Sequence, residues 1–292
     1  MGDPNVDKDI LALIAKGNVK FSKGQKQIAK YIAENYDKAA FMTAKKLGKT
    51  VGVSESTVVR FAAELGYDGY PGMRKALQEM IRNRLTSLQR IEVAKDLFDH
   101  KDVLHAVLTT DMEKIEVTRG EMDQKSFDEA VEQILAAEHV YIFGMRSSAS
   151  LASFMGYYLN LIRENVHVIQ DMSNSECYEQ IVHIKEGDVF IGISYPRYSS
   201  RTVKAMRFAR SMGSHVIGIT DGNNSPFIGI ADTNLFAHSE MVSFLDSLVA
   251  PLSLINALIV AIGLRTNDAL STAFNRLESI WSEFEVYETL DD

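Results

Sequence analysis

Two groups of polar side chains in the sequence could bind anions, and the first lies in the N-terminal fifth of the chain. Ser54, Ser56 and Thr57 begin a stretch of helical composition that continues through Val59 and Arg60. Hydroxyl groups at the positive end of a helix can bind backbone phosphates, and an arginine can bond a guanine edge or a phosphate. These five residues are therefore the candidate DNA-binding side chains.

A pair of short helices must hold this group in place. Ala44, Leu47 and Val51 line one side of the first expected helix. Gly52 allows the left-handed turn that a tight corner needs, and Ser54 is a good N-cap for the second helix. Two helices that meet at a glycine-containing corner are typical of the DNA-binding helix-turn-helix unit.

The second helix has two distinct faces in helical projection. The core face gathers Val58, Phe61, Ala62 and Leu65. The opposite face carries Ser56, Val59, Arg60 and Ala63. Small or polar groups and one arginine suit a helix that enters a major groove, where bulk would obstruct approach. The alternative is a plain helical hairpin with a polar outer face.

The second group of candidates lies at two strand-to-helix corners. These ligand-binding candidates are Gly144, Arg146, Ser147, Ser148, Ser194, Arg197 and Ser199. Backbone N–H groups, serine oxygens and a helix dipole together surround an anion, of which phosphate is the usual one, and a guanidinium matches phosphate or carboxylate. The alternatives are that the serines only cap helices and that each arginine forms a structural ion pair.

These corners belong to a predicted α/β domain. Short apolar runs at 139–143, 165–169, 188–193, 215–219 and 233–237 alternate with segments of helical composition. Strands separated by helix-length crossovers predict a mostly parallel five-stranded sheet flanked by helices, and both corners follow carboxyl ends of strands, where open α/β sheets bind ligands. Two helices separated near Thr266 close the predicted domain.

Charge divides the chain in the same way. Residues 1–90 hold 16 Lys and Arg against 9 Asp and Glu, while the other 202 residues hold 15 against 30. We expect an all-α helix-turn-helix domain at 1–85, a helical connector at 86–124, interrupted near 99–102, and the α/β domain at 125–292. A basic module joined to an acidic one is compatible with DNA binding by the first.

Several classes of protein and site are not expected. The single cysteine, Cys177, cannot form an internal disulfide, no secretory leader is evident, and the longest apolar stretch, 252–264, is too short for a membrane span. We therefore expect a cytoplasmic protein without a membrane role. The histidine spacing and the lack of a Lys-Ser/Thr glycine-rich loop predict no metal, no nucleotide and no cofactor.

The chain resembles the RpiR-type (ribose phosphate isomerase repressor-like) transcriptional regulators over essentially its whole length. Their helix-turn-helix is similar to residues 53–61 and 65–70 here, and their C-terminal half is a sugar isomerase (SIS) domain. The resemblance implies a homo-oligomeric regulator of sugar-catabolic or amino-sugar genes, usually a dimer, with a tetramer as the alternative. It implies double-stranded operator DNA as one partner and a phosphosugar as the effector.

The two SIS loops resemble those of the family only in part. Gly144 and Ser148 fit a Gly-x-Gly-x-Ser loop, but Arg146 stands where the second glycine is usual. Ser194 and Ser199 fit a Ser-x-Ser-Gly-x-Thr/Ser loop, in which residues 196–197, Pro-Arg, replace the middle Ser-Gly. Each departure removes flexibility or a hydroxyl and adds a cation.

Two functions follow from the sequence. The first is a sequence-specific transcriptional regulator, not an enzyme, whose operator affinity a phosphorylated sugar modulates. The second is a sugar-phosphate isomerase with an accessory helical domain, which would need a carboxylate or imidazole near the substrate carbon. Glu176, His183 and Glu240 are the candidates for that catalytic group, and none lies in a recognisable catalytic motif.

Overall fold

The structure is a computed structural model of all 292 residues, and it divides the chain into two compact units. Unit 1 is Met1–Val107 with Met241–Asp246, and unit 2 is Leu108–Glu240 with Ser247–Asp292. The residues it describes are 10–15, 21–82, 86, 88–91, 102–170, 175–239 and 245–287. The boundaries of the three predicted functional segments remain predictions, and the predicted interruption near 99–102 lies, except for Asp102, outside the described residues.

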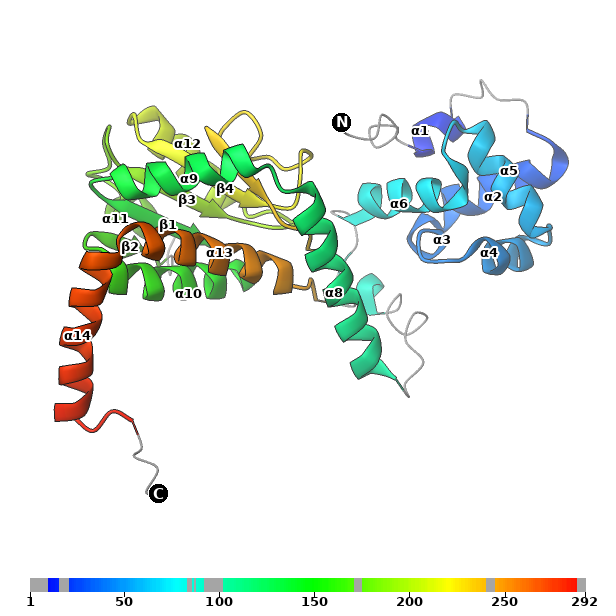
Figure 1. The fold of residues 1–292 in the computed structure, drawn as a ribbon. Coiled ribbons are helices and arrows are strands. Elements are labelled where there is room, and N and C mark those ends of the chain that lie inside the picture. Colours follow the sequence, from blue (N-terminus) through cyan, green and yellow to red (C-terminus); the bar gives the residue numbers. More distant parts are fainter. Residues whose placement is uncertain are drawn as a thin grey trace, which may run out of the picture. The chain divides into compact units, whose positions relative to one another are not determined.

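Unit 1 is helical throughout residues 10–82 wherever the structure describes regular elements, as predicted (Figure 1). Its helices are α1 (Ile10–Ala15), α2 (Lys23–Glu34), α3 (Tyr36–Ala39), α4 (Ala44–Val51), α5 (Glu55–Glu64) and α6 (Gly69–Arg82). Ile28, Leu47 and Phe61 are fully buried in one core. The Tyr70 hydroxyl donates to the Met42 carbonyl at 2.8 Å, and burial raises the pKa of Tyr70 to about 12.

Unit 2 contains a five-stranded sheet in which every paired strand is parallel, which confirms the α/β prediction. The strands are β1 (Val140–Gly144), β2 (Val166–Val168), β3 (Val189–Ile193), β4 (His215–Thr220) and β5 (Thr233–Phe236), in the order β2-β1-β3-β4-β5. Each bound lies within about one residue of the predicted run, because continuous apolar runs are typical of strands buried on both faces.

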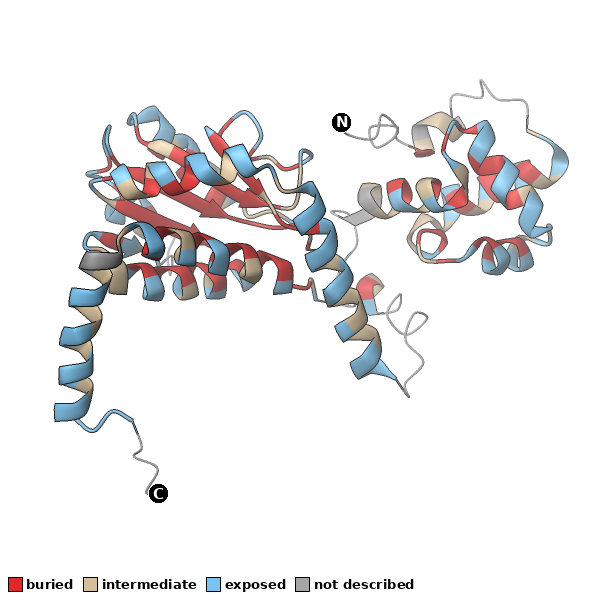
Figure 2. Ribbon diagram, in the orientation of Figure 1, coloured by how far each residue is buried: buried red, intermediate tan, exposed pale blue. Residues whose placement is uncertain are grey.

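Helices cover both faces of the sheet (Figure 1). One face packs against α9 (Gln124–Ala136), α10 (Ser147–Ile162) and α13 (Val249–Arg265), and the other against α11 (Glu176–Gln180) and α12 (Ser200–Ser211). The remaining helices are α8 (Val103–Glu121) and α14 (Asn267–Glu283). The strands are buried between exposed outer helix faces (Figure 2), so functional side chains of this unit must lie at the sheet edges or on the helices.

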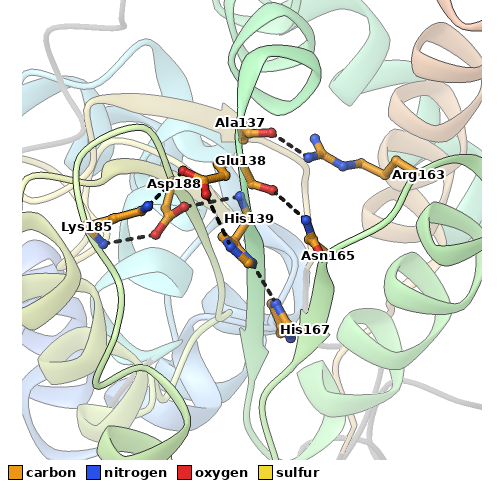
Figure 3. A network of polar contacts seen from close by, with 8 residues as sticks. All are labelled: Ala137, Glu138, His139, Arg163, Asn165, His167, Lys185 and Asp188. Carbon is orange, nitrogen blue, oxygen red and sulfur yellow. Dashed lines mark hydrogen bonds and ion pairs between the residues drawn. The ribbon is translucent and has the colours of Figure 1, made fainter.

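A polar network joins the amino ends of β1, β2 and β3 (Figure 3). The buried Asp188 carboxylate accepts the backbone N–H groups of His139 and Lys185 at 3.1 and 3.0 Å. His139 Nδ1 and His167 Nε2 lie 3.1 Å apart, and partial burial together with the neighbouring His139 lowers the pKa of His167. This network fixes the strand register at the edge opposite to the predicted ligand corners.

No single helix in the described part of the chain is long and apolar enough to cross a bilayer. The helical stretches Val249–Arg265 and Leu270–Glu283 reach the length and apolar composition of a membrane span only when they are taken together. The two stretches are bent by 103° relative to each other.

Candidate DNA-binding and ligand-binding sites

The helix-turn-helix corner forms where the sequence predicts it. Gly52 ends α4 with φ 74°, a left-handed conformation that suits glycine. A Cβ on Gly48 would lie 2.9 Å from the Val53 carbonyl oxygen, so the close approach of the two helices also requires glycine there. The predictions did not single out Gly48, because only the folded path of the chain brings Val53 against it.

The two faces of α5 separate as predicted. Val58, Phe61 and Ala62 are fully buried and Leu65 is nearly so. Ser56, Val59, Arg60 and Ala63 are all exposed, and Val59 is 41% exposed although it is apolar. An exposed surface of small side chains and one arginine can enter a DNA groove without steric obstruction.

The hydroxyl groups at the start of α5 form a cluster. Ser54 is the N-cap, and its Oγ accepts the Thr57 backbone N–H at 3.3 Å. The same oxygen lies 2.9 Å from Ser56 Oγ and 2.8 Å from Thr57 Oγ1. Arg60 Nε donates to the Ser56 carbonyl at 3.3 Å, so its guanidinium lies along the exposed face. The structure thus brings together four of the five predicted DNA-binding side chains, and Val59 stands exposed beside Arg60 on the same helix.

The first ligand corner joins β1 to α10. A Cβ on Gly144 would lie 2.4 Å from the Ser148 carbonyl oxygen, so the first turn of α10 packs directly against the strand end. Ser148 is buried, and Ser147 is exposed beside it. The Ser148 and Ala149 N–H groups of this turn donate to the Met145 and Arg146 carbonyls at 3.1 Å, and the dipole of α10, a helix of 16 residues, makes this end attractive to anions.

The second ligand corner joins β3 to α12. Ser194 Oγ accepts the Ser199 backbone N–H at 3.0 Å, and Ser199 Oγ caps α12 by accepting the Thr202 backbone N–H at 3.3 Å. Tyr198 donates its hydroxyl to Asp221, which follows β4, at 2.8 Å. These contacts hold the loop at the carboxyl edge of the sheet. A serine oxygen that accepts an N–H still has its own proton to donate to an anion.

The two corners are neighbours, as the sequence predicts. Gly144 and Ile193 are paired residues of the adjacent strands β1 and β3, so the loops that follow them leave the same edge side by side. All seven predicted ligand-binding residues therefore belong to one edge of the sheet.

One feature of these loops was missed in the sequence. Arg146 has φ 58° and ψ −124°, and Arg197 has φ 65°, so both predicted arginines adopt the left-handed half of conformational space that favours glycine. Both stand where the resemblance places a glycine, which was the available signal. Both arginines thus have a backbone conformation that glycine favours, at positions where the resemblance places a glycine.

The structure describes two of the three residues named for an enzymatic alternative. Glu176 begins α11 at partial exposure, whereas His183 is exposed in the segment that leads to the amino end of β3, the opposite edge. Glu240 lies outside the described residues. Within the described ranges, no three His, Cys, Asp or Glu side chains are placed to hold a metal ion.

Comparison with known proteins gives the same two parts. Residues 8–84 match the helix-turn-helix domain of the rpiR family, and residues 133–261 match the SIS domain. An uncharacterized HTH-type transcriptional regulator of Caldanaerobacter subterraneus subsp. tengcongensis is 25% identical over 258 residues, which cover 87% of this chain and 90% of the relative.

Two solved structures are similar. The sugar isomerase domain of an RpiR transcription factor from Sphaerobacter thermophilus is 29% identical, with a TM-score of 0.57, over 59% of this chain and 96% of that one. The NanR protein of Vibrio vulnificus, complexed with ManNAc-6P, is 20% identical, with a TM-score of 0.56, over 94% of this chain and 99% of that one. The second likeness therefore extends over both parts of the fold.

Proposed function

Because the chain is a transcriptional regulator of the RpiR type, we propose how it works. It consists of a helix-turn-helix domain of the rpiR family joined to a SIS domain. Helix α5 binds the major groove of operator DNA, and a phosphorylated sugar or amino sugar at the carboxyl edge of the sheet changes the operator affinity. The observation that carries the proposal is the exposed face of α5, held away from the core by the glycine corner.

The residues of α5 take different parts in DNA binding. Arg60 reads a base or a phosphate, and the exposed Val59 contacts the groove beside it. The hydroxyl cluster of Ser54, Ser56 and Thr57 lies at the positive end of the helix and positions a backbone phosphate. The exposed Lys45, Lys46 and Lys49 of α4 neutralise DNA phosphates and release their counterions, so DNA binding weakens as the salt concentration increases.

The effector site lies at the two corners. The phosphate binds at the N-terminus of α10 and at the loop that precedes α12, with Ser148, Ser194 and Ser199 as hydroxyl donors, and Arg146 and Arg197 add positive charge to the same edge. The NanR protein of similar fold was solved with ManNAc-6P, which supports a phosphosugar as the chemical class.

The proposed regulator is a homo-oligomer, of which a dimer is the simplest form. Among the large apolar side chains that unit 2 exposes, those on α10, α13 and α14 are the ones that we expect a second copy to cover. They are Tyr157 on α10, Val260 and Leu264 on α13, and Ile280 on α14, followed by Phe284. A paired arrangement presents two copies of α5 to a two-fold symmetric operator, with half-sites about 10 base pairs, or a multiple of this, apart.

The proposed ligand binding is not accompanied by turnover. Hydrogen bonds to a phosphate act equally on substrate and transition state, so they bind without accelerating a reaction. The isomerase alternative needs in addition a positioned base at the same edge, for which Glu176 is the candidate within the described residues.

The experiment that tests this function combines DNA binding with a search for turnover. Fluorescence anisotropy with DNA from the region upstream of the gene, with and without a panel of sugar phosphates, should show specific binding that one class of ligand alters. Light scattering of residues 125–292 should give an oligomer. Interconversion of aldose and ketose phosphates that Glu176→Gln abolishes would favour the isomerase instead.

A further inference from the structure

The two arginines at the ligand corners have a backbone conformation that an arginine normally avoids. Arg146 at φ 58° and ψ −124° immediately precedes α10, and Arg197 at φ 65° lies in the loop before α12. Strained non-glycine residues persist where the surroundings maintain them, and they concentrate at ligand sites. Two such residues of the same type and charge, on neighbouring loops, suggest that the positive charges themselves are needed there.

The positive charge of Arg146 is exposed to solvent at the first ligand corner. Its side chain is exposed, and among the described residues it makes no hydrogen bond or ion pair. The alternative that it is a structural ion pair is therefore not supported by the described contacts. A guanidinium without a protein partner at this edge is available to a bound anion.

A second, independent observation, a buried hydroxyl without a partner, points to a ligand at the second corner. Thr202 is fully buried in the first turn of α12, and its Oγ1 has no hydrogen-bond partner. It lies on the sheet-facing side of α12, one turn closer to the N-terminus than Met206, whose sulfur contacts Gly192 of β3. Thr202 therefore faces the end of β3, between the strand and the loop that carries Ser194 and Ser199. An orphaned buried hydroxyl there is satisfied when a ligand oxygen binds.

The hydroxyl donors are already sufficient for one phosphate. The hydroxyls of Ser148, Ser194 and Thr202, beside the positive ends of the α10 and α12 dipoles, match the three terminal oxygens of a single phosphate. The guanidinium of Arg146 lies outside this set, at the exposed rim of the corner. A second cationic group at the rim matches a second anionic group on the same ligand.

We propose that the effector carries a second anionic group in addition to its phosphate, either a carboxylate or a second phosphate, and that Arg146 selects it. The inference rests on the proposed function, since it concerns the same effector site. Arg197 on the neighbouring loop adds positive charge to the same edge. A neutral sugar monophosphate is then the weaker ligand.

Matched pairs of ligands test this selectivity. Isothermal titration calorimetry on the full chain compares 6-phosphogluconate with glucitol 6-phosphate, its open-chain counterpart without the carboxylate, and fructose 1,6-bisphosphate with fructose 6-phosphate. The members of each pair differ in one anionic group, so the pairs also distinguish a carboxylate from a second phosphate. We expect the doubly anionic member of at least one pair to bind about tenfold or more tightly, a difference of about 1.4 kcal/mol.

Variants of Arg146 show whether this residue causes the preference. Arg146→Gln keeps the strained backbone but removes the charge. In the pair that shows the preference, the ratio of the affinities for the doubly anionic and the singly anionic ligand should then fall close to one. Arg146→Lys keeps the charge and should retain a preference. Arg207→Gln removes one exposed positive charge farther along α12 and should leave the ratio unchanged, which controls for net charge.

The possible outcomes separate the two proposals. Equal affinities within both pairs, or a preference that Arg146→Gln does not reduce, would overturn the inference while the phosphosugar function stands. Failure of all four ligands to bind a protein that still binds DNA would overturn the inference and the proposed effector class together.

Discussion

The backbone at Arg146 leads to a stability prediction that is independent of any ligand. A non-glycine residue in this region of conformational space costs about 1–3 kcal/mol. Glycine adopts it without steric penalty but loses about 0.5–1 kcal/mol through the greater entropy of the unfolded chain. We therefore expect Arg146→Gly to stabilise unit 2 by about 1 kcal/mol, although it removes a side chain from the proposed ligand site.

The single tryptophan makes this measurement specific to one unit. Trp281 lies on α14 of unit 2, with its ring 5.3 Å from that of Tyr287, so its fluorescence reports the unfolding of unit 2 in the full chain. A stabilisation of 1 kcal/mol raises the melting temperature of a domain of 150–250 residues by about 2–4 °C. Urea titration of the same variant should show a higher midpoint with an unchanged slope.

The control is the same substitution in a helix. Arg207 lies in the interior of α12, where glycine costs about 1 kcal/mol relative to a good helix former, so Arg207→Gly should lower the midpoint. If Arg146→Gly raises the midpoint and Arg207→Gly lowers it, the backbone conformation at the two positions is the cause, because the chemical change is the same. A lower midpoint for Arg146→Gly would refute the reasoning, because the arginine side chain would then contribute more than the backbone strain removes.

Three further predictions concern other parts of the chain. Arg60→Ala should weaken specific operator binding by about 1–3 kcal/mol with less effect on unrelated DNA, and equal affinity for the operator would exclude Arg60 from base recognition. Ser54→Ala should destabilise unit 1 by about 1 kcal/mol through loss of the α5 cap, as measured by circular dichroism, whereas Ser56→Ala should have little effect on stability. The pKa of His167 is lowered in the folded state, so the folded protein binds its proton less readily than the unfolded chain and stability falls as pH decreases below about 6.5. His167→Gln should reduce that loss in urea titrations between pH 7.5 and 5, and an identical pH dependence would show that His167 does not cause it.

Local patterns account for most of what the sequence predicts. The strands of unit 2 appear as separate apolar runs because both faces of the sheet are buried, and the helix-turn-helix appears through Gly52 and the Ser54 cap, which act on adjacent residues. Features that depend on distant parts of the chain could not be predicted. The need for glycine at Gly48 comes from the Val53 carbonyl, and the buried role of Asp188 comes from its acceptance of the His139 N–H.

The positive φ of Arg146 illustrates a different limit. Residue type normally reports backbone conformation through glycine or asparagine, and an arginine gives the opposite indication. The conformation follows from the close packing of the first turn of α10 against Gly144, which fixes the path of the chain whatever residue occupies the corner. The signal in the sequence was indirect, since only the resemblance places a glycine at this position.

Two described residues after β5, His238 and Ser247, contact α8, the helix in which the chain passes from one unit to the other. His238, two residues beyond β5, donates its backbone N–H to Thr118 Oγ1 at 2.9 Å, and Ser247 donates to Asp111 at 2.6 Å, so this segment holds α8 at two points within unit 2. Asp246, the residue before Ser247, belongs to unit 1 and pairs at 3.0 Å with Arg90, which is buried. His238 and Ser247 are thus both bonded to α8, and Ser247 is covalently joined to Asp246, the partner of Arg90. We therefore expect the segment after β5, together with α8, to transmit the effector signal, since the chain passes between the two units in both places.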